Sequence, residues 1–131
     1  MIKYGYTIIY VSNVKSALEF YKSAFGFDCR FLHESGDYGE LETGNTVLAF
    51  ASHELGKSNF QNGYVATDES KIPLGIEIAL VTEEVESAHA LAISKGAEEI
   101  KKPEKKPWGQ LVSYVRCPSG VLVELCTPIN A

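Results

Sequence analysis

Two residues are candidates for binding chemistry: a carboxylate inside an apolar strand and a tryptophan in a turn. Glu124 lies between Val123 and Leu125 in an apolar run. A carboxylate there needs a hydrogen-bonding partner or a wet cavity, which favours a functional site over simple packing. Trp108 is the only tryptophan of the chain and lies between a proline and a glycine. An indole in such a turn has little reason to join the core, so its ring is available to stack on a flat or cationic ligand.

The histidines and cysteines show no pattern typical of metal or disulfide chemistry. His33 and His53 lie near a strand end or in a loop, where a lone histidine is more often hydrogen-bonded or exposed than a metal ligand. His89 lies on a predicted helix, and we expect a structural role for it. The cysteines are odd in number and lack a C-x-x-C spacing, which favours reduced, partly buried thiols. They are Cys29, Cys117 and Cys126.

Charge and hydropathy exclude several partners. The formal net charge of -5 argues against a general nucleic-acid surface and favours neutral or cationic ligands. The lysine-rich stretch at residues 101–106 is interrupted by Pro103 and Glu104, which predicts a solvated hairpin and no phosphate-binding patch. No apolar run approaches the roughly 18 residues that span a bilayer, and the first residues do not resemble a signal peptide. We therefore expect a cytoplasmic protein with no membrane partner.

The first half of the sequence predicts one strand, one helix and three further strands. Residues 6–11 form an apolar, β-branched run followed by Ser12 and Asn13, which are good helix N-caps. Apolar residues then recur at the spacing of one helical face over residues 13–25, until Gly26 permits a left-handed end. Three strands are predicted at residues 28–33, 39–43 and 46–52, separated by turn-forming residues.

The same order of elements returns roughly 70 residues later, which indicates an internal duplication. A strand at 76–81 precedes a helix that Thr82 would cap and Gly96 would end, and strands follow at 98–101, 110–116 and 120–127. We predict an α+β fold of two βαβββ modules, residues 1–52 and 74–131, within one domain spanning 1–131. The polar, irregular segment 53–73 is predicted to be a linker or lid loop, and the curved mixed sheets are expected to enclose a cleft.

Several segments resemble the vicinal oxygen chelate superfamily, which includes glyoxalase I, extradiol dioxygenases, fosfomycin-resistance enzymes and bleomycin-resistance proteins. The resemblance covers almost the whole chain. It is carried by VSNVKSALEFY at 11–21, FGF at 25–27, PWG at 107–109, CPSG at 117–120 and VEL at 123–125. It implies the glyoxalase/bleomycin-resistance/dioxygenase fold of paired βαβββ modules, and a homodimer.

Metalloenzymes of this superfamily bind a divalent metal at four equivalent strand positions. The resemblance places these positions at Tyr6, Ala49, Glu77 and Glu124, of which only the two glutamates are credible ligands. We therefore expect no metal and no other cofactor. The alternative is a metal-dependent lyase, isomerase or dioxygenase with an altered ligand set, in which Glu77 and Glu124 would be metal ligands and catalytic residues.

The resemblance is closer to bleomycin-resistance proteins, which sequester a planar cationic drug between aromatic residues without chemistry. The matching aromatic positions are Phe31, Tyr38 and Trp108, although strand packing is an equal alternative for the first two. Glu77 and Glu124 would make the cleft floor acidic and hold one another's pKa values up. We predict a binding protein for an aromatic or cationic small molecule. Its expected ligand-binding residues are Phe31, Tyr38, Trp108, Glu77, Glu124 and Tyr6.

Overall fold

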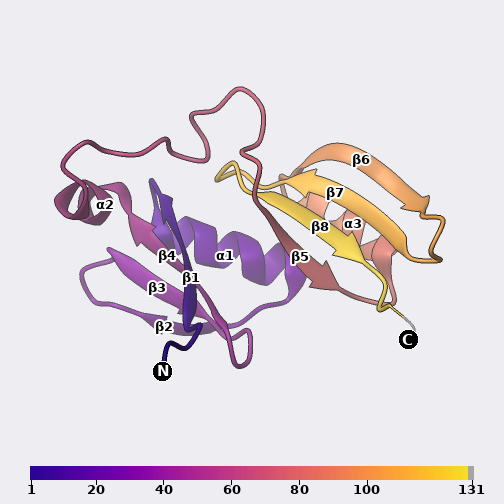
Figure 1. Cartoon of the computed structure of the whole chain (residues 1–131), viewed down its shortest axis with the longest axis horizontal. Coiled ribbons are helices and arrows are strands. Elements are labelled where there is room, and N and C mark those ends of the chain that lie inside the picture. Colours follow the sequence, from indigo (N-terminus) through magenta and orange to yellow (C-terminus); the bar gives the residue numbers. More distant parts are fainter. Residues whose placement is uncertain (130–131) are drawn as a thin grey trace. The chain divides into compact units, whose positions relative to one another are not determined.

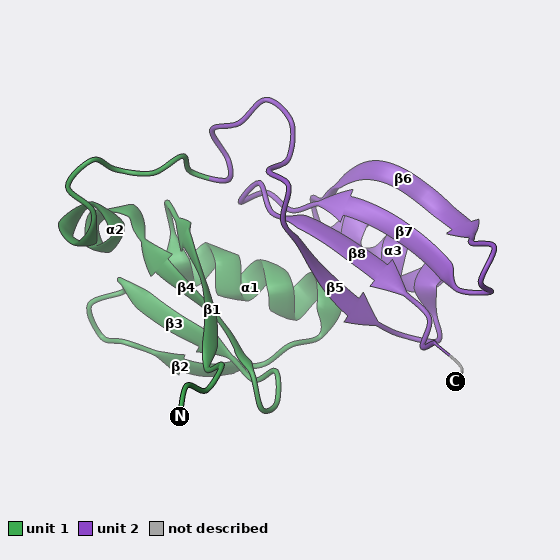
Figure 2. Ribbon diagram, viewed as in Figure 1, with its two compact units in different colours: residues 1–66 green, residues 67–131 purple. Residues whose placement is uncertain are grey.

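The computed structural model describes residues 1–129 and divides the chain into two compact units, residues 1–66 and 67–131 (Figure 2). Each unit holds a four-stranded mixed sheet with a helix packed on it. This confirms the predicted α+β fold of two βαβββ modules. Neither sheet closes on itself. Within residues 1–129, no helix combines the length and apolar character needed to cross a bilayer.

Unit 1 contains the first βαβββ module (Figure 1). Its elements are β1 (Tyr6–Val11), α1 (Val14–Phe25), β2 (Cys29–Leu32), β3 (Tyr38–Leu41) and β4 (Val47–Ser52). The strand order is β1-β4-β3-β2, with β1 parallel to β4 and the other pairs antiparallel. The side chain of Asn13 accepts a hydrogen bond from the backbone N–H of Ser16, and Gly26 ends the helix at φ 81°, as the sequence predicts.

Helix α1 packs on only one face of the unit 1 sheet. The buried ring of Tyr21 lies 5.1 Å from the ring of Phe50 on β4, measured between centroids. Gly39 lets the helix approach β3, because a Cβ atom there would lie 2.7 Å from Cδ1 of Leu18. Phe50 and Gly39 therefore face the helix. The residues next to them along each strand point to the opposite face of the sheet, which we call the uncovered face.

The structure differs from the sequence prediction at the start of the 53–73 segment, which forms helix α2 (His53–Asn59) where an irregular loop was expected. The hydroxyl of Ser52 accepts a hydrogen bond from the N–H of Leu55, and this N-cap starts the helix. Tyr10 on β1 contacts α2, because its hydroxyl accepts a 3.4 Å hydrogen bond from the side-chain amide of Asn59. Its ring also lies 5.0 Å from that of Tyr64 and 5.8 Å from that of Phe60, which follow the helix. The position of α2 therefore depends on the tertiary packing of these rings. Residues 53–59 have no apolar repeat at helical spacing that would predict the helix from the sequence.

Unit 2 contains the second βαβββ module, with strand order β5-β8-β7-β6. Its elements are β5 (Glu77–Val81), α3 (Val85–Ser94), β6 (Glu98–Lys105), β7 (Leu111–Arg116) and β8 (Leu122–Cys126). The sequence predicted that Thr82 would cap this helix, but α3 begins later, at Val85. The Thr82 hydroxyl nevertheless accepts a hydrogen bond from the N–H of Glu84.

Strand β6 continues through the lysine-rich stretch to Lys105, beyond the predicted end at residue 101. It lies at the edge of the sheet, and its register with β7 shifts between Lys101 and Glu104. Lysines and a proline on an edge strand oppose pairing with other chains, which gives this stretch a structural explanation.

His89 joins α3 to the sheet and has the structural role expected from its place on the helix. Its side chain is only 5% exposed. Nδ1 lies 2.9 Å from the hydroxyl of Ser113, a fully buried residue of β7, and Nε2 lies 2.9 Å from a carboxylate oxygen of Glu99 on β6. One imidazole thus satisfies polar groups on two strands beneath the helix.

We predict that His89→Ala destabilises the protein by about 2 kcal/mol, because it leaves the buried Ser113 hydroxyl unpaired and creates a cavity. Urea unfolding followed by circular dichroism measures this loss. Ser94→Ala, at the exposed end of the same helix, is the matched control and should change the free energy of unfolding by less than about 0.5 kcal/mol. Equal effects of the two substitutions would contradict the role assigned to His89.

Candidate functional site

The uncovered face of the unit 2 sheet carries a pair of carboxylates. Ser113 of β7 points toward α3, so its neighbour Tyr114 points away from the helix. Glu124 is the cross-strand partner of Tyr114 and shares this face, and the phenol of Tyr114 donates a 3.0 Å hydrogen bond to Oε1 of Glu124. Glu77, on the adjacent strand β5, is hydrogen-bonded to Glu124. The structure therefore brings together two of the predicted site residues.

The electrostatics of this cluster favour bound protons. Burial raises the pKa of Glu77, and the hydrogen bond to Glu124 and the charge of Glu124 raise it further. Burial and the neighbouring Glu124 also raise the pKa of Tyr114 to about 12 and that of the Cys126 thiol to about 11. Tyr114 thus remains a hydrogen-bond donor at neutral pH. A cationic group beside the pair would favour the charged form of Glu77, which the charge of Glu124 disfavours.

The uncovered face of the unit 1 sheet carries aromatic side chains. The phenol of Tyr38 donates a 2.7 Å hydrogen bond to Oε2 of Glu40, and burial followed by this bond raises the pKa of Tyr38. Phe31 pairs in register with Glu40 and is 46% exposed. Tyr6, which adds to the electrostatic effect on Tyr38, is 57% exposed. Three predicted ligand-binding residues therefore share one face.

Trp108 lies in the turn between β6 and β7, with its side chain outside the core. It is 66% exposed, and its Nε1–H donates a 2.7 Å hydrogen bond to Oε1 of Gln110. The turn adjoins the end of the sheet where β8 finishes, because Val112 pairs with Cys126. Glu77 pairs with Leu122 at the other end of β8. The six predicted residues are thus divided, three in each unit.

The sequence analysis missed the hydrogen-bonding partners of these residues. Glu40 accepts from Tyr38 and lies 3.7 Å from Nε of Arg30, measured to Oε1. Tyr114 is the partner of Glu124 in unit 2. Glu40 and Tyr114 occupy equivalent register positions, opposite Ala49 and Glu124. Residue spacing alone does not reveal either partner, because these pairings depend on the register between strands.

Two of the three cysteines are buried as expected, and the third is not. Cys117 and Cys126 are buried, whereas Cys29 is exposed on β2, and all three are free thiols. Cys29 lies at an edge strand whose residues are all exposed, so it has no packing role comparable to that of the other two.

The donor atoms of this chain do not fit the four-ligand metal centre that the superfamily resemblance implies. Ala49 has no ligating side-chain atom and is fully buried, and Tyr6 offers a phenol, which rarely ligates metals. Glu77 and Glu124 are engaged with one another. The alternative ligands His33 and His53 contact a serine and a tyrosine, respectively. Across residues 1–129, no three His, Cys, Asp or Glu side chains gather in a way that could hold a metal ion.

Comparisons with known proteins identify the family. The model of the Glyoxalase/Bleomycin resistance protein/Dioxygenase superfamily matches residues 3–125. The chain therefore belongs to this superfamily. No curated protein matches the chain at a significant level.

Solved structures share the fold at low sequence identity. A glyoxalase-related enzyme from Fulvimarina pelagi has a TM-score of 0.81 and 17% identity, over 98% of this chain and 89% of that one. A glyoxalase/bleomycin resistance protein/dioxygenase family enzyme from Burkholderia phytofirmans PsJN has a TM-score of 0.75 and 22% identity, over 94% and 96%. TioX from Micromonospora sp. ML1 has a TM-score of 0.70 and 15% identity, over 96% and 98%. At these sequence identities, the similarity to the solved structures concerns the fold alone.

We predict that Glu77→Gln stabilises the protein at alkaline pH. The folded-state pKa of Glu77 is raised above its ordinary 4.5, so the stability linked to its proton is present at low pH and lost as pH rises through the raised pKa. Glutamine cannot ionise and removes the repulsion from Glu124. Because Glu77 is exposed and water screens its charge, we expect a gain of only about 0.5 kcal/mol at about pH 8 and almost none at about pH 4.

Urea unfolding at both pH values measures this difference. Glu34→Gln, which removes an exposed carboxylate from a unit 1 turn, is the control for net charge. A gain from Glu77→Gln that does not grow with pH would show that the two carboxylates do not share a proton.

Proposed function

We propose that this protein binds and sequesters a small molecule that is aromatic, cationic or both, as bleomycin-resistance-like members of the superfamily do, without a metal ion and without chemistry. The observation that carries the proposal is the Glu77–Glu124 pair on the uncovered face of unit 2. Two adjacent carboxylates with one hydroxyl donor form a site for a cation, because a positive group can take the place of the shared proton.

The aromatic residues supply the second part of the proposed recognition. Trp108, Tyr6 and Phe31 are each at least 46% exposed in the structure, so their ring faces are accessible to a ligand. A flat ligand gains from stacking on such rings, and a cation over a tryptophan face gains about 0.5 to 2 kcal/mol. The bond from Tyr38 to Glu40 fixes a further ring at a set orientation.

Charge distinguishes the two uncovered faces. In unit 1 the carboxylate Glu40 is partly neutralised by Arg30 at 3.7 Å. In unit 2 the described contacts of Glu124 are with Glu77, Tyr114 and Cys126, none of which is cationic. The proposal therefore assigns the positive part of the ligand to the uncovered face of unit 2, and Trp108 of the same unit offers an exposed ring for its aromatic part. We further infer from superfamily membership that the binding form is a homodimer in the cytoplasm.

A matched pair of ligands tests the proposal. The planar cation 9-aminoacridine and its parent acridine, which is neutral at about pH 8, differ chiefly in charge and are titrated by isothermal calorimetry. We expect the cation to bind more tightly than acridine, and the preference to disappear when Glu124→Gln removes the charge. Glu34→Gln controls for net charge and should keep the preference.

Trp108→Ala tests the aromatic part of the same proposal. We expect it to weaken 9-aminoacridine binding by about 2- to 30-fold, the range that corresponds to a cation over an indole face. Tyr4→Ala is the control, because Tyr4 is also 66% exposed but is not a predicted site residue. The proposal fails if neither ligand binds, or if binding is the same for the wild type, Glu124→Gln and Trp108→Ala.

A further inference from the structure

A second feature of unit 2 lies outside the carboxylate cluster: the side chain of Arg116 is surrounded by backbone carbonyl oxygens. Nη2 of its guanidinium donates 2.9 Å hydrogen bonds to the carbonyls of Thr67 and Ser70, and Nη1 donates to that of Lys71 at 3.2 Å. Its Nε donates to the carbonyl of Gly120 at 3.1 Å. One side chain thus links residues 67–71, which we call the strap, to the turn between β7 and β8.

The turn and the strap also touch directly. Thr67 donates a 2.6 Å hydrogen bond from its hydroxyl to the carbonyl of Ser119. Gly120 has φ 91°, and a Cβ atom at this position would overlap the carbonyl group of Thr67. A glycine is therefore required here both by the backbone conformation and by the closeness of the strap.

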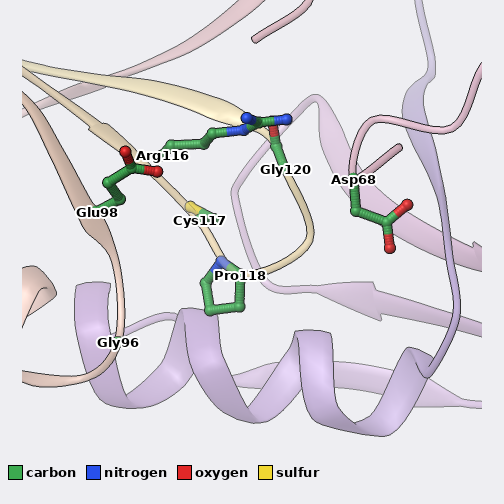
Figure 3. Close-up of a pocket in the computed structure, with 7 residues that line it drawn as sticks. All are labelled: Asp68, Gly96, Glu98, Arg116, Cys117, Pro118 and Gly120. Carbon is green, nitrogen blue, oxygen red and sulfur yellow. The ribbon is translucent and has the colours of Figure 1, made fainter. Parts of the chain in front are cut away.

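The strap forms part of the wall of a hollow of about 270 Å³ (Figure 3). Its lining residues are Asp68, Gly96, Glu98, Arg116, Cys117, Pro118 and Gly120. Figure 3 shows Asp68 of the strap on one side of the hollow and Glu98 on the other, with the guanidinium of Arg116 beside Gly120. Movement of the strap would carry Asp68 away and change this wall.

We propose that residues 67–71 are a strap held closed on unit 2 by the side chain of Arg116, which acts as a tethered cation inside a cage of carbonyl oxygens. A charged donor forms stronger hydrogen bonds than a neutral one, and Arg116 makes several at once. Release of this side chain opens the strap and the hollow beside it. The inference does not depend on the proposed ligand or on the Glu77–Glu124 pair.

Lys71 offers a direct probe of strap closure. It is exposed and lies in irregular backbone, as Lys3 does. Trypsin cleaves after lysine only where the backbone can enter its active site, so an exposed lysine in irregular backbone is normally a good target. The carbonyl of Lys71, which belongs to the bond that trypsin cuts, is bound by Arg116 in the closed strap.

The experiment is limited trypsin digestion of the full chain, with cleavage after Lys71 and Lys3 followed by mass spectrometry. In the wild type we expect cleavage after Lys71 to be at least about tenfold slower than after Lys3, a ratio in line with the loss of one charged hydrogen bond. In Arg116→Gln we expect the two rates to become similar. Free guanidinium ion at low, non-denaturing concentration should restore protection in that variant, whereas sodium ion at the same concentration should not.

Two results would overturn the proposal. One is wild-type cleavage after Lys71 at the same rate as after Lys3. The other is full protection of Lys71 in Arg116→Gln. If that variant does not fold, the wild-type rates remain decisive by themselves. Binding of 9-aminoacridine is measured separately, so failure of the strap and failure of the proposed function are distinguishable.

Discussion

In each unit the helix of the βαβββ module, α1 in unit 1 and α3 in unit 2, packs on one face of a four-stranded sheet and leaves the other face without it. The packed faces are ordinary cores, built around Tyr21 and Phe50 in unit 1 and around the His89 contacts in unit 2. The uncovered faces hold the polar and aromatic residues that a core would exclude. The chemistry that this protein can perform therefore follows from strand alternation, which sends every second side chain to the uncovered face.

The duplication gives the two uncovered faces the same geometry but different charges. Equivalent register positions hold Glu40 in unit 1 and Tyr114 in unit 2, opposite Ala49 and Glu124. Unit 1 thereby gains a single carboxylate that Tyr38 and Arg30 partly satisfy, whereas unit 2 gains two carboxylates and a phenol. The same fold can thus present an aromatic face and an acidic face. Of the two faces, the acidic one in unit 2 is therefore the better suited to a cation.

The sequence allowed the fold to be predicted because its signals were local. Asn13, Gly26 and the apolar repeat between them defined α1 almost to the residue, and the repeat of this pattern revealed the second module. Helix α2 was missed because its place depends on ring packing between Tyr10 and Tyr64, which are distant in sequence. The full length of β6 was missed because charged residues and a proline on an edge strand look like a loop.

The candidate site could be predicted from the sequence less completely than the fold. The apolar surroundings of Glu124 correctly indicated that its carboxylate needs a partner, and the structure supplies Tyr114 and Glu77. The partners themselves could not be found from spacing, because cross-strand neighbours depend on register. The expectation of a cleft enclosed by the sheets and lined by these residues remains a prediction.

The central claim is that Glu77 and Glu124 share a proton on the uncovered face of unit 2. A carbon-13 NMR titration of the glutamate side-chain carboxyl groups tests it directly, with Glu124→Gln used to assign the coupling. A shared proton predicts that Glu77 titrates above its ordinary pKa of 4.5, and that this elevation shrinks when the charge of Glu124 is removed. Titration of Glu77 at or below 4.5, unaltered by Glu124→Gln, would contradict the account.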